Sequence, residues 1–123
     1  MNSLTTLFLS YNQFTGTIPS SIFKNLTNLM IISTSHNQFN DSISFSTFLK
    51  GTIPLWLLNN LIACSLILRG NFLKGPFLLF TQRNNSMLQE LDIFDNIIFG
   101  ELHSNIDALF PNLIVFNMSQ NEL

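Results

Sequence analysis

Histidine, cysteine and carboxylate side chains most often carry metal binding or catalysis, and this sequence spaces them poorly for either purpose. Its histidines are His36 and His103, and Glu101 and Asp107 flank the second of them. Metal sites usually combine several histidine or cysteine ligands at short, regular spacings, and no paired spacing of that kind occurs here. We therefore expect neither a metal site nor a bound cofactor.

The single cysteine, Cys64, lies in an apolar run that leads into Leu66. A thiol in such surroundings is usually a small core side chain rather than a nucleophile. The sequence also contains no G-x-S-x-G turn, no phosphate-binding loop and no set of kinase motifs. We therefore predict that the chain is not an enzyme.

Charge and hydropathy argue against two further classes of protein. Five basic and seven acidic residues give a net charge of −2 without any basic stripe, so we expect no nucleic-acid partner. The longest apolar stretch, Leu61–Leu68, is interrupted by Ser65 and is far too short to span a bilayer. The first residues lack the basic region of a signal peptide. We expect neither a signal peptide nor a membrane span in this chain.

The elements that must position the polar side chains follow from a pattern that begins in Leu4–Pro19. This stretch reads L-x-x-L-x-L-x-x-N-x-F-x-G-x-I-P, so apolar residues first alternate and then give way to turn-forming residues. The alternation predicts a short strand with one inward face. The asparagine can then bond open backbone groups where the chain turns. It recurs along the chain, and we predict a structural ladder of Asn12, Asn37, Asn71, Asn96 and Asn121.

These asparagines are separated by 25, 34, 25 and 25 residues, and three equal gaps of this length indicate a leucine-rich repeat. One repeat cannot bury its own apolar edge, so neighbours must stack. We therefore predict a repeat solenoid of the α/β class. It would be a right-handed superhelix with a short parallel β-sheet on its concave face and irregular or 3-10 return limbs. We expect residues 1–123 to form one array of about five repeats without caps.

The longer gap predicts an irregularity in this array. Gly51–Pro54 repeats the GTIP of Gly16–Pro19, and counting back from its glycine places the ladder position at Thr47, soon after Asn37. Roughly fifteen residues of a regular array are therefore missing. The interruption is either a tolerated irregular loop or the trace of a deletion. We expect a register break near residues 40–54, with a locally widened or broken sheet.

Each predicted strand has an inward and an outward set of side chains. The inward set is expected to be Leu7, Leu9, Ile32, Leu66, Leu68, Leu91, Ile93, Phe116 and Met118. Solenoids bind partners on the outward, concave surface, and aromatic and arginine side chains are common anchors of interfaces. We predict the following ligand-binding residues: Tyr11, His36, Arg69, Phe72, Glu90, Asp92, Phe94 and Asp95. The alternative is an ordinary solvated sheet.

Some stretches carry a more specific signal than the repeat itself. They are Pro54–Asn60, Leu66–Asn71, Gly75–Phe77, Phe110–Leu113 and Asn117–Asn121. Together with the G-x-I-P return limb, they resemble the extracellular repeats of plant leucine-rich-repeat receptor-like proteins and receptor-like kinases. Such families also have a cysteine-bearing cap, a signal peptide and a membrane-spanning helix, which are not matched here. The resemblance therefore implies a fragment of an ectodomain.

By this resemblance, the chain is a protein- or peptide-binding module in plant signalling or defence. It implies a protein or peptide ligand, a co-receptor as a further partner, and a place on the extracellular side of the plasma membrane. Two other interpretations stay open: a non-functional product of a truncated gene, and part of a secreted leucine-rich-repeat inhibitor of a wall-degrading enzyme. The parent could equally be a receptor-like protein or a receptor kinase.

The sequence also contains N-x-S/T sequons, the acceptor motif for N-glycosylation in secreted proteins. Their number is close to the roughly three that the composition gives by chance, so they are not evidence of secretion. The candidate acceptors are Asn25, Asn40, Asn84 and Asn117.

Overall fold

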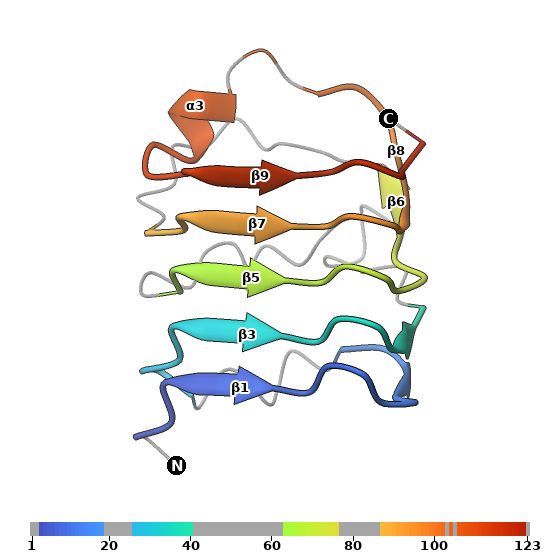
Figure 1. Cartoon of the computed structure of the whole chain (residues 1–123). Coiled ribbons are helices and arrows are strands. Elements are labelled where there is room, and N and C mark those ends of the chain that lie inside the picture. The colour runs from blue at the N-terminus through green and yellow to red at the C-terminus, as the bar shows by residue number, and fades with distance from the viewer. Residues whose placement is uncertain are drawn as a thin grey trace, which may run out of the picture.

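The computed structural model describes residues 3–18, 26–40, 63–76, 87–102, 104 and 106–122. Five short strands form one parallel sheet in the order β1-β3-β5-β7-β9 (Figure 1). Their bounds are Thr6–Phe8 (β1), Ile31–Ser33 (β3), Ser65–Ile67 (β5), Glu90–Asp92 (β7) and Val115–Asn117 (β9). Each turn of the chain adds one strand beside the last, which confirms the predicted solenoid.

Equivalent apolar residues stand side by side in this sheet. The register pairs Leu7 with Ile32, Ile32 with Leu66, Leu66 with Leu91, and Leu91 with Phe116. The three central residues of this row are buried, whereas the two at its ends are half-buried. Of the other expected inward residues, Leu68 and Ile93 are buried, and Leu9 and Met118 are half-buried. The alternation of apolar and polar residues therefore predicted the inward face of the strands.

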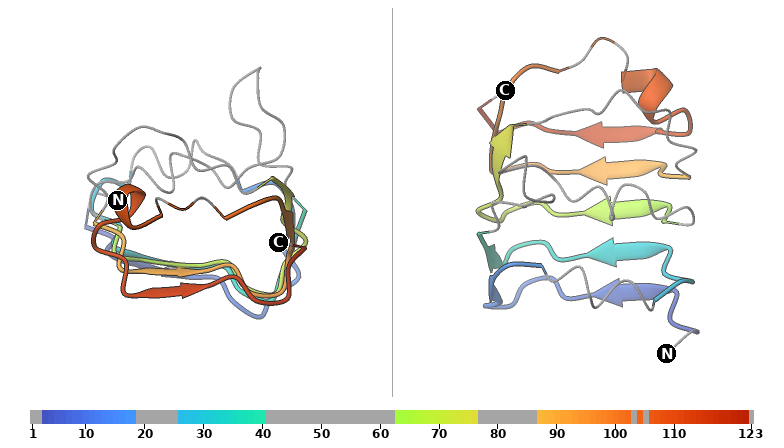
Figure 2. Two further views of the ribbon diagram at one scale, coloured as in Figure 1. Left: turned by 90° about the horizontal axis from the view of Figure 1, so that it is seen from above. Right: turned by 180° about the vertical axis from the view of Figure 1, so that it is seen from behind.

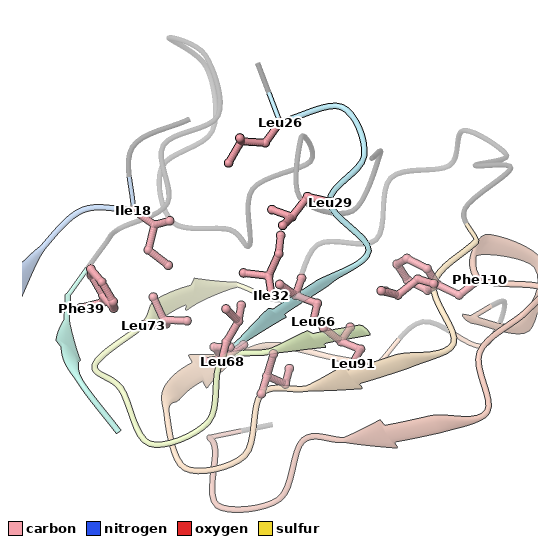
Figure 3. Packing of buried hydrophobic residues seen from close by; sticks show 13 residues of the cluster. Ile18, Leu26, Leu29, Ile32, Phe39, Leu66, Leu68, Leu73, Leu91 and Phe110 are labelled. Atoms are coloured by element: carbon pink, nitrogen blue, oxygen red, sulfur yellow. The ribbon is translucent and has the colours of Figure 1, made fainter. Parts of the chain in front are cut away.

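The core lies between this sheet and the segments that lead back to it. Figure 3 shows Leu29, Ile32 and Leu66 pointing toward one another, with Leu68 and Leu91 beside them. Two positions depart from the leucine pattern, and both are still buried: Thr34 and Ala63. The core is thus a continuous stack to which every turn contributes, and no single turn encloses it.

Short side strands follow the turns that contain the repeated asparagines, beyond the C-terminal ends of the main strands. Strand β2 (Thr15–Gly16) pairs with β4 (Gln38–Phe39), and β6 (Lys74–Pro76) pairs with β8 (Ile97–Phe99). The short helix α3 (Ile106–Leu109) precedes β9 and lies on the opposite side, where the main strands begin (Figure 2). Among the described residues, no helix is long and apolar enough to cross a membrane.

The expectation of a widened or broken sheet is wrong for the main sheet. Strand β3 pairs directly with β5, in the same register as the pairs on either side. The 34-residue gap therefore closes one turn of the solenoid without disturbing the pairing of its strands. The side strands differ, since β2–β4 and β6–β8 form two separate sheets. Residues 41–62, which hold most of the predicted register break, lie outside the described residues.

The repeated asparagines connect successive turns through the backbone. The Nδ2 of Asn37 donates to the carbonyl of Leu9 in the preceding turn (2.9 Å) and to those of Thr34 and Ser35 in its own (3.0 and 3.2 Å). Its Oδ1 accepts from the backbone N–H of Phe14 (3.1 Å). Equivalent contacts recur at Asn71, Asn96 and Asn121. Each of these amides satisfies backbone groups of two turns at once.

Candidate ligand-binding face

The residue before each ladder asparagine has a left-handed backbone. The φ angles are +57° at Tyr11, +52° at His36, +62° at Gly70, +55° at Asp95 and +58° at Gln120. Such values are uncommon for residues other than glycine, so the surrounding turn must hold them. The backbone N–H groups of the first four donate to carbonyls of the next turn at 2.9 to 3.0 Å. The row therefore presents its side chains from a constrained backbone at the end of the strands.

Tyr11 and His36 form an aromatic pair in this row. Their ring centroids are 4.5 Å apart and the rings are 19° from parallel, while Tyr11 is 79% exposed. A Cβ atom at Gly70, the next residue in the row, would lie 2.6 Å from Nδ1 of His36. Only glycine leaves room for the imidazole there. The pair thus depends on a residue that the sequence places 34 positions further along the chain.

A second cluster forms around Arg69. Its Cζ lies 4.8 Å from the centroid of the Phe94 ring, and its Nη1 lies 3.7 Å from Oδ2 of Asp92. Asp92 is buried, and its Oδ1 accepts from the backbone N–H of Phe94 (3.0 Å). The Arg69 side chain is 40% exposed, and its Nε is buried without a hydrogen-bond partner among the described residues. The guanidinium is therefore held by an aromatic face and a carboxylate.

The remaining acidic and aromatic candidates have different surroundings. Glu90 is half-buried, and its Oε2 accepts from Oγ of Ser65 (2.5 Å). Asp95 is exposed. Phe72 is exposed as well, but it follows the ladder turn and precedes β6, so it lies apart from the main strands. Of the acidic side chains predicted here, only Asp95 is both exposed and without a described side-chain bond.

Hydroxyl groups bond across the first two turns in a way that the sequence pattern does not reveal. Oγ of Ser33 lies 2.7 Å from Oγ of Ser10 and 3.3 Å from Oγ of Ser35. Ser33 and Ser35 are both buried although they point away from the core. In the sequence, Ser33 and Ser35 alternate with Thr34, which indicates that the two serines share one face of the strand. The alternation does not indicate that their hydroxyl groups form hydrogen bonds.

Sequence reasoning also missed a cavity at the start of the strands. It has a volume of about 410 Å³, and its described lining consists of Thr5, Asn28, Met30, Cys64 and Met87. Thr5 lies before β1, Asn28 and Met30 before β3, Cys64 before β5 and Met87 before β7. Because they come from four different parts of the sequence, no local motif brings them together. Cys64, which we expected in the core, is half-buried and lines this cavity.

Other predicted sites are only partly described. Asn40 is exposed, and Asn117 on β9 is half-buried with its Oδ1 accepting from the N–H of Ser119 (3.3 Å). Asn25, Asn84 and His103 lie outside the described residues. Within the described ranges, no group of three or more histidine, cysteine or carboxylate side chains could hold a metal ion.

Comparisons with known proteins agree with the leucine-rich-repeat fold of the chain. Residues 3–26 match the Leucine Rich Repeat family. Receptor-like protein 1 of Arabidopsis thaliana is 34% identical over 94 residues, which make up 76% of this chain. The chain has a leucine-rich-repeat fold and is similar to a plant receptor-like protein. It spans only 8% of the length of that relative.

Solved ectodomains of plant receptors resemble this leucine-rich-repeat array over 98% of its length. The plant peptide hormone receptor RGFR1, in complex with RGF2, has a TM-score of 0.75 at 28% identity, with 17% of that chain covered. The receptor kinase SOBIR1 of Arabidopsis thaliana gives 0.71 at 25%, with 58% covered. The Arabidopsis receptor kinase HAESA, in complex with the peptide hormone IDA and the co-receptor SERK1, gives 0.68 at 29%, with 22% covered. The array therefore has the repeat architecture of plant receptor ectodomains.

Proposed function

We propose that this array is a protein- or peptide-binding module of a plant receptor-like protein in signalling or defence. It would act on the extracellular side of the plasma membrane, bind its ligand on the concave face and carry out no catalysis itself. RGFR1 and HAESA, which it resembles, are each described in complex with a peptide hormone, and HAESA also with a co-receptor. These likenesses support a peptide ligand, with a co-receptor as a second partner.

The observation that carries the proposal is the pair of preformed clusters on the concave face. Tyr11 stacks on His36, and Arg69 lies over Phe94 with Asp92 beside it. Both clusters stand on backbone that hydrogen bonds hold in place, so their side chains lose little freedom when a ligand binds. Aromatic and arginine side chains in such positions are the usual anchors of interfaces.

The charges on this face indicate the chemistry of the ligand. Asp95 is exposed, and Glu90 accepts one hydrogen bond from Ser65, so both can receive donors from a ligand. Asp92 is buried and pairs with Arg69, and it therefore contributes less than the other two. A peptide with a positive group near Asp95 and an apolar or aromatic side chain near Phe94 fits these surroundings.

A random-peptide display library selected against the purified chain tests the proposal. We expect enriched peptides to bind the Tyr11→Ala and Phe94→Ala variants more weakly, by about 1–3 kcal/mol each if both are anchors. Phe99→Ala is the matched control, because Phe99 is an exposed phenylalanine on the side strand β8. Asp95→Ala should weaken the binding of peptides that carry a positive group, and Asp107→Ala on α3 is its matched control.

The controls decide whether the concave face is the binding surface. Peptides that bind the Tyr11, Phe94 and Asp95 alanine variants as tightly as the unaltered chain would reject it. So would peptides whose binding is lost only in the Phe99 or Asp107 variants, because these side chains lie away from the concave face.

A further inference from the structure

The cavity at the start of the strands concentrates the sulfur atoms of the protein. The sequence contains four methionines and one cysteine, and three of these five side chains line this single cavity: Met30, Cys64 and Met87. The other described lining residues are Thr5 and Asn28, so no charged side chain is among them. Two thioethers and a thiol are soft ligands, and this donor set selects monovalent copper over harder cations.

Backbone pairing places these three residues on consecutive turns. The N–H of Cys64 donates to the carbonyl of Met30 (2.8 Å), and the N–H of Gln89 donates to the carbonyl of Cys64 (2.8 Å). Met30 and Cys64 are therefore neighbours just before the adjacent strands β3 and β5, with backbones roughly 4.8 Å apart along the hydrogen-bonding direction of the sheet. Met87 precedes Gln89 by two residues and lines the same cavity as Cys64 from the following turn. Met30, Cys64 and Met87 thus precede β3, β5 and β7, and their side chains line one cavity.

The exposure of the methionines gives them the freedom that coordination requires. Met30 is 44% exposed and Met87 is 48% exposed, so neither is locked in the core. Methionine is unbranched and has several rotatable bonds, which lets its sulfur adjust to a metal. Cys64 is half-buried and lines the same open cavity, so an ion could reach its sulfur.

We propose that Met30, Cys64 and Met87 form a binding site for a soft monovalent cation, with copper(I) as the physiological class. On binding, the thiol of Cys64 releases its proton to solvent and its sulfur forms a bond to the metal, while each thioether donates a lone pair. One thiolate neutralises one monovalent cation, so the occupied site carries no net charge. A divalent cation would leave an uncompensated positive charge beside apolar side chains, which is unfavourable.

Silver(I) is the probe for this site, because it shares the ligand preference of copper(I) and is stable in air. Native mass spectrometry of the purified chain should show one silver ion bound. Loss of a partner that only orients a metal ligand already costs roughly 10- to 100-fold in affinity, so Met30→Leu and Met87→Leu should each weaken binding at least that much. Cys64→Ser should abolish it. Met118→Leu, on the inner face beyond β9, is the matched control and should bind as the unaltered chain does.

The methionine variants separate this site from simple binding by a thiol. If both leucine variants bind silver as tightly as the unaltered chain, the cysteine acts alone and the proposal is wrong. An unaltered chain that binds no silver also rejects it. X-ray absorption at the copper edge gives a second measurement that does not depend on variants. Three sulfur neighbours around copper(I) support the site, whereas one or two contradict it.

Discussion

The central and terminal turns of the solenoid use the same sequence pattern but reach different degrees of burial. Leu66 on β5 and Leu91 on β7 are completely buried, whereas Leu7 on β1 and Phe116 on β9 occupy equivalent positions and are only half-buried. The side chains themselves do not explain the difference, because leucine occurs in both places. A neighbour on each side completes the burial of a turn, so the neighbouring turns supply much of its stability.

The asparagines show the same difference in hydrogen bonding. Asn71 is buried and bonds backbone groups of two turns. Asn12, in the first described turn, is exposed and donates only within its own turn, to the carbonyls of Leu9 and Ser10. One side chain at one position of the repeat therefore acts as a link between turns or as a local turn residue, depending on its neighbours.

Truncating the core should give the largest difference between centre and end. Leu66→Ala leaves a cavity in a fully packed site and should lower the free energy of unfolding by about 2–5 kcal/mol. Leu7→Ala removes the same atoms from a half-exposed site and should cost clearly less. Urea unfolding of both variants, followed by circular dichroism, measures the two losses. Equal losses would show that neighbouring turns do not determine burial energy.

Removing a ladder amide should come next in size. Asn71→Ala leaves the backbone N–H of Phe39 without its acceptor in a buried site, which should cost about 1–3 kcal/mol. Asn12→Ala affects only exposed groups and should cost less than about 1 kcal/mol. The same unfolding measurements apply. A loss for Asn12→Ala as large as that for Asn71→Ala would argue that the links between turns contribute little.

Two glycines with left-handed backbones, Gly16 on the side strand β2 and Gly70 on the concave face, sharpen the comparison. A Cβ at Gly16 meets no atom within 4 Å, whereas one at Gly70 meets the His36 ring. Both alanine variants pay a conformational cost of about 1–2 kcal/mol, and only Gly70→Ala also displaces the imidazole. Gly70→Ala should therefore be the less stable variant, and the NMR signals of His36 should shift in it alone. Unchanged His36 signals would contradict the close contact.

The smallest effect should be a gain of stability at the centre. The Oγ1 of Thr34 is buried and has no hydrogen-bond partner among the described residues, at a position where the pattern expects leucine. Thr34→Val replaces the hydroxyl by a methyl group of similar size and should stabilise the chain by roughly 1 kcal/mol. A shift of the urea midpoint to higher concentration would agree with this. A destabilised variant would mean that the hydroxyl is bonded.

Much of the fold could be predicted because it depends on short-range patterns. Alternation around Leu7 and Leu9 placed one face inward, and the spacing from Asn12 to Asn37 gave the length of a turn. The sequence also indicated that Arg69 and Phe94 face outward. It could not indicate that Arg69 lies over the Phe94 ring, because that contact depends on the register between two turns.

The sequence by itself therefore determined the repeat, the strands and the face on which each strand side chain lies, because these follow from spacing within one turn. Only the tertiary structure decided which residues of different turns meet. The 34-residue turn keeps β3 beside β5, and this pairing places Gly70 against His36 and Cys64 beside Met30. A return limb can change in length without changing the strand register, since the ladder bonds and the buried row of apolar residues fix that register across turns.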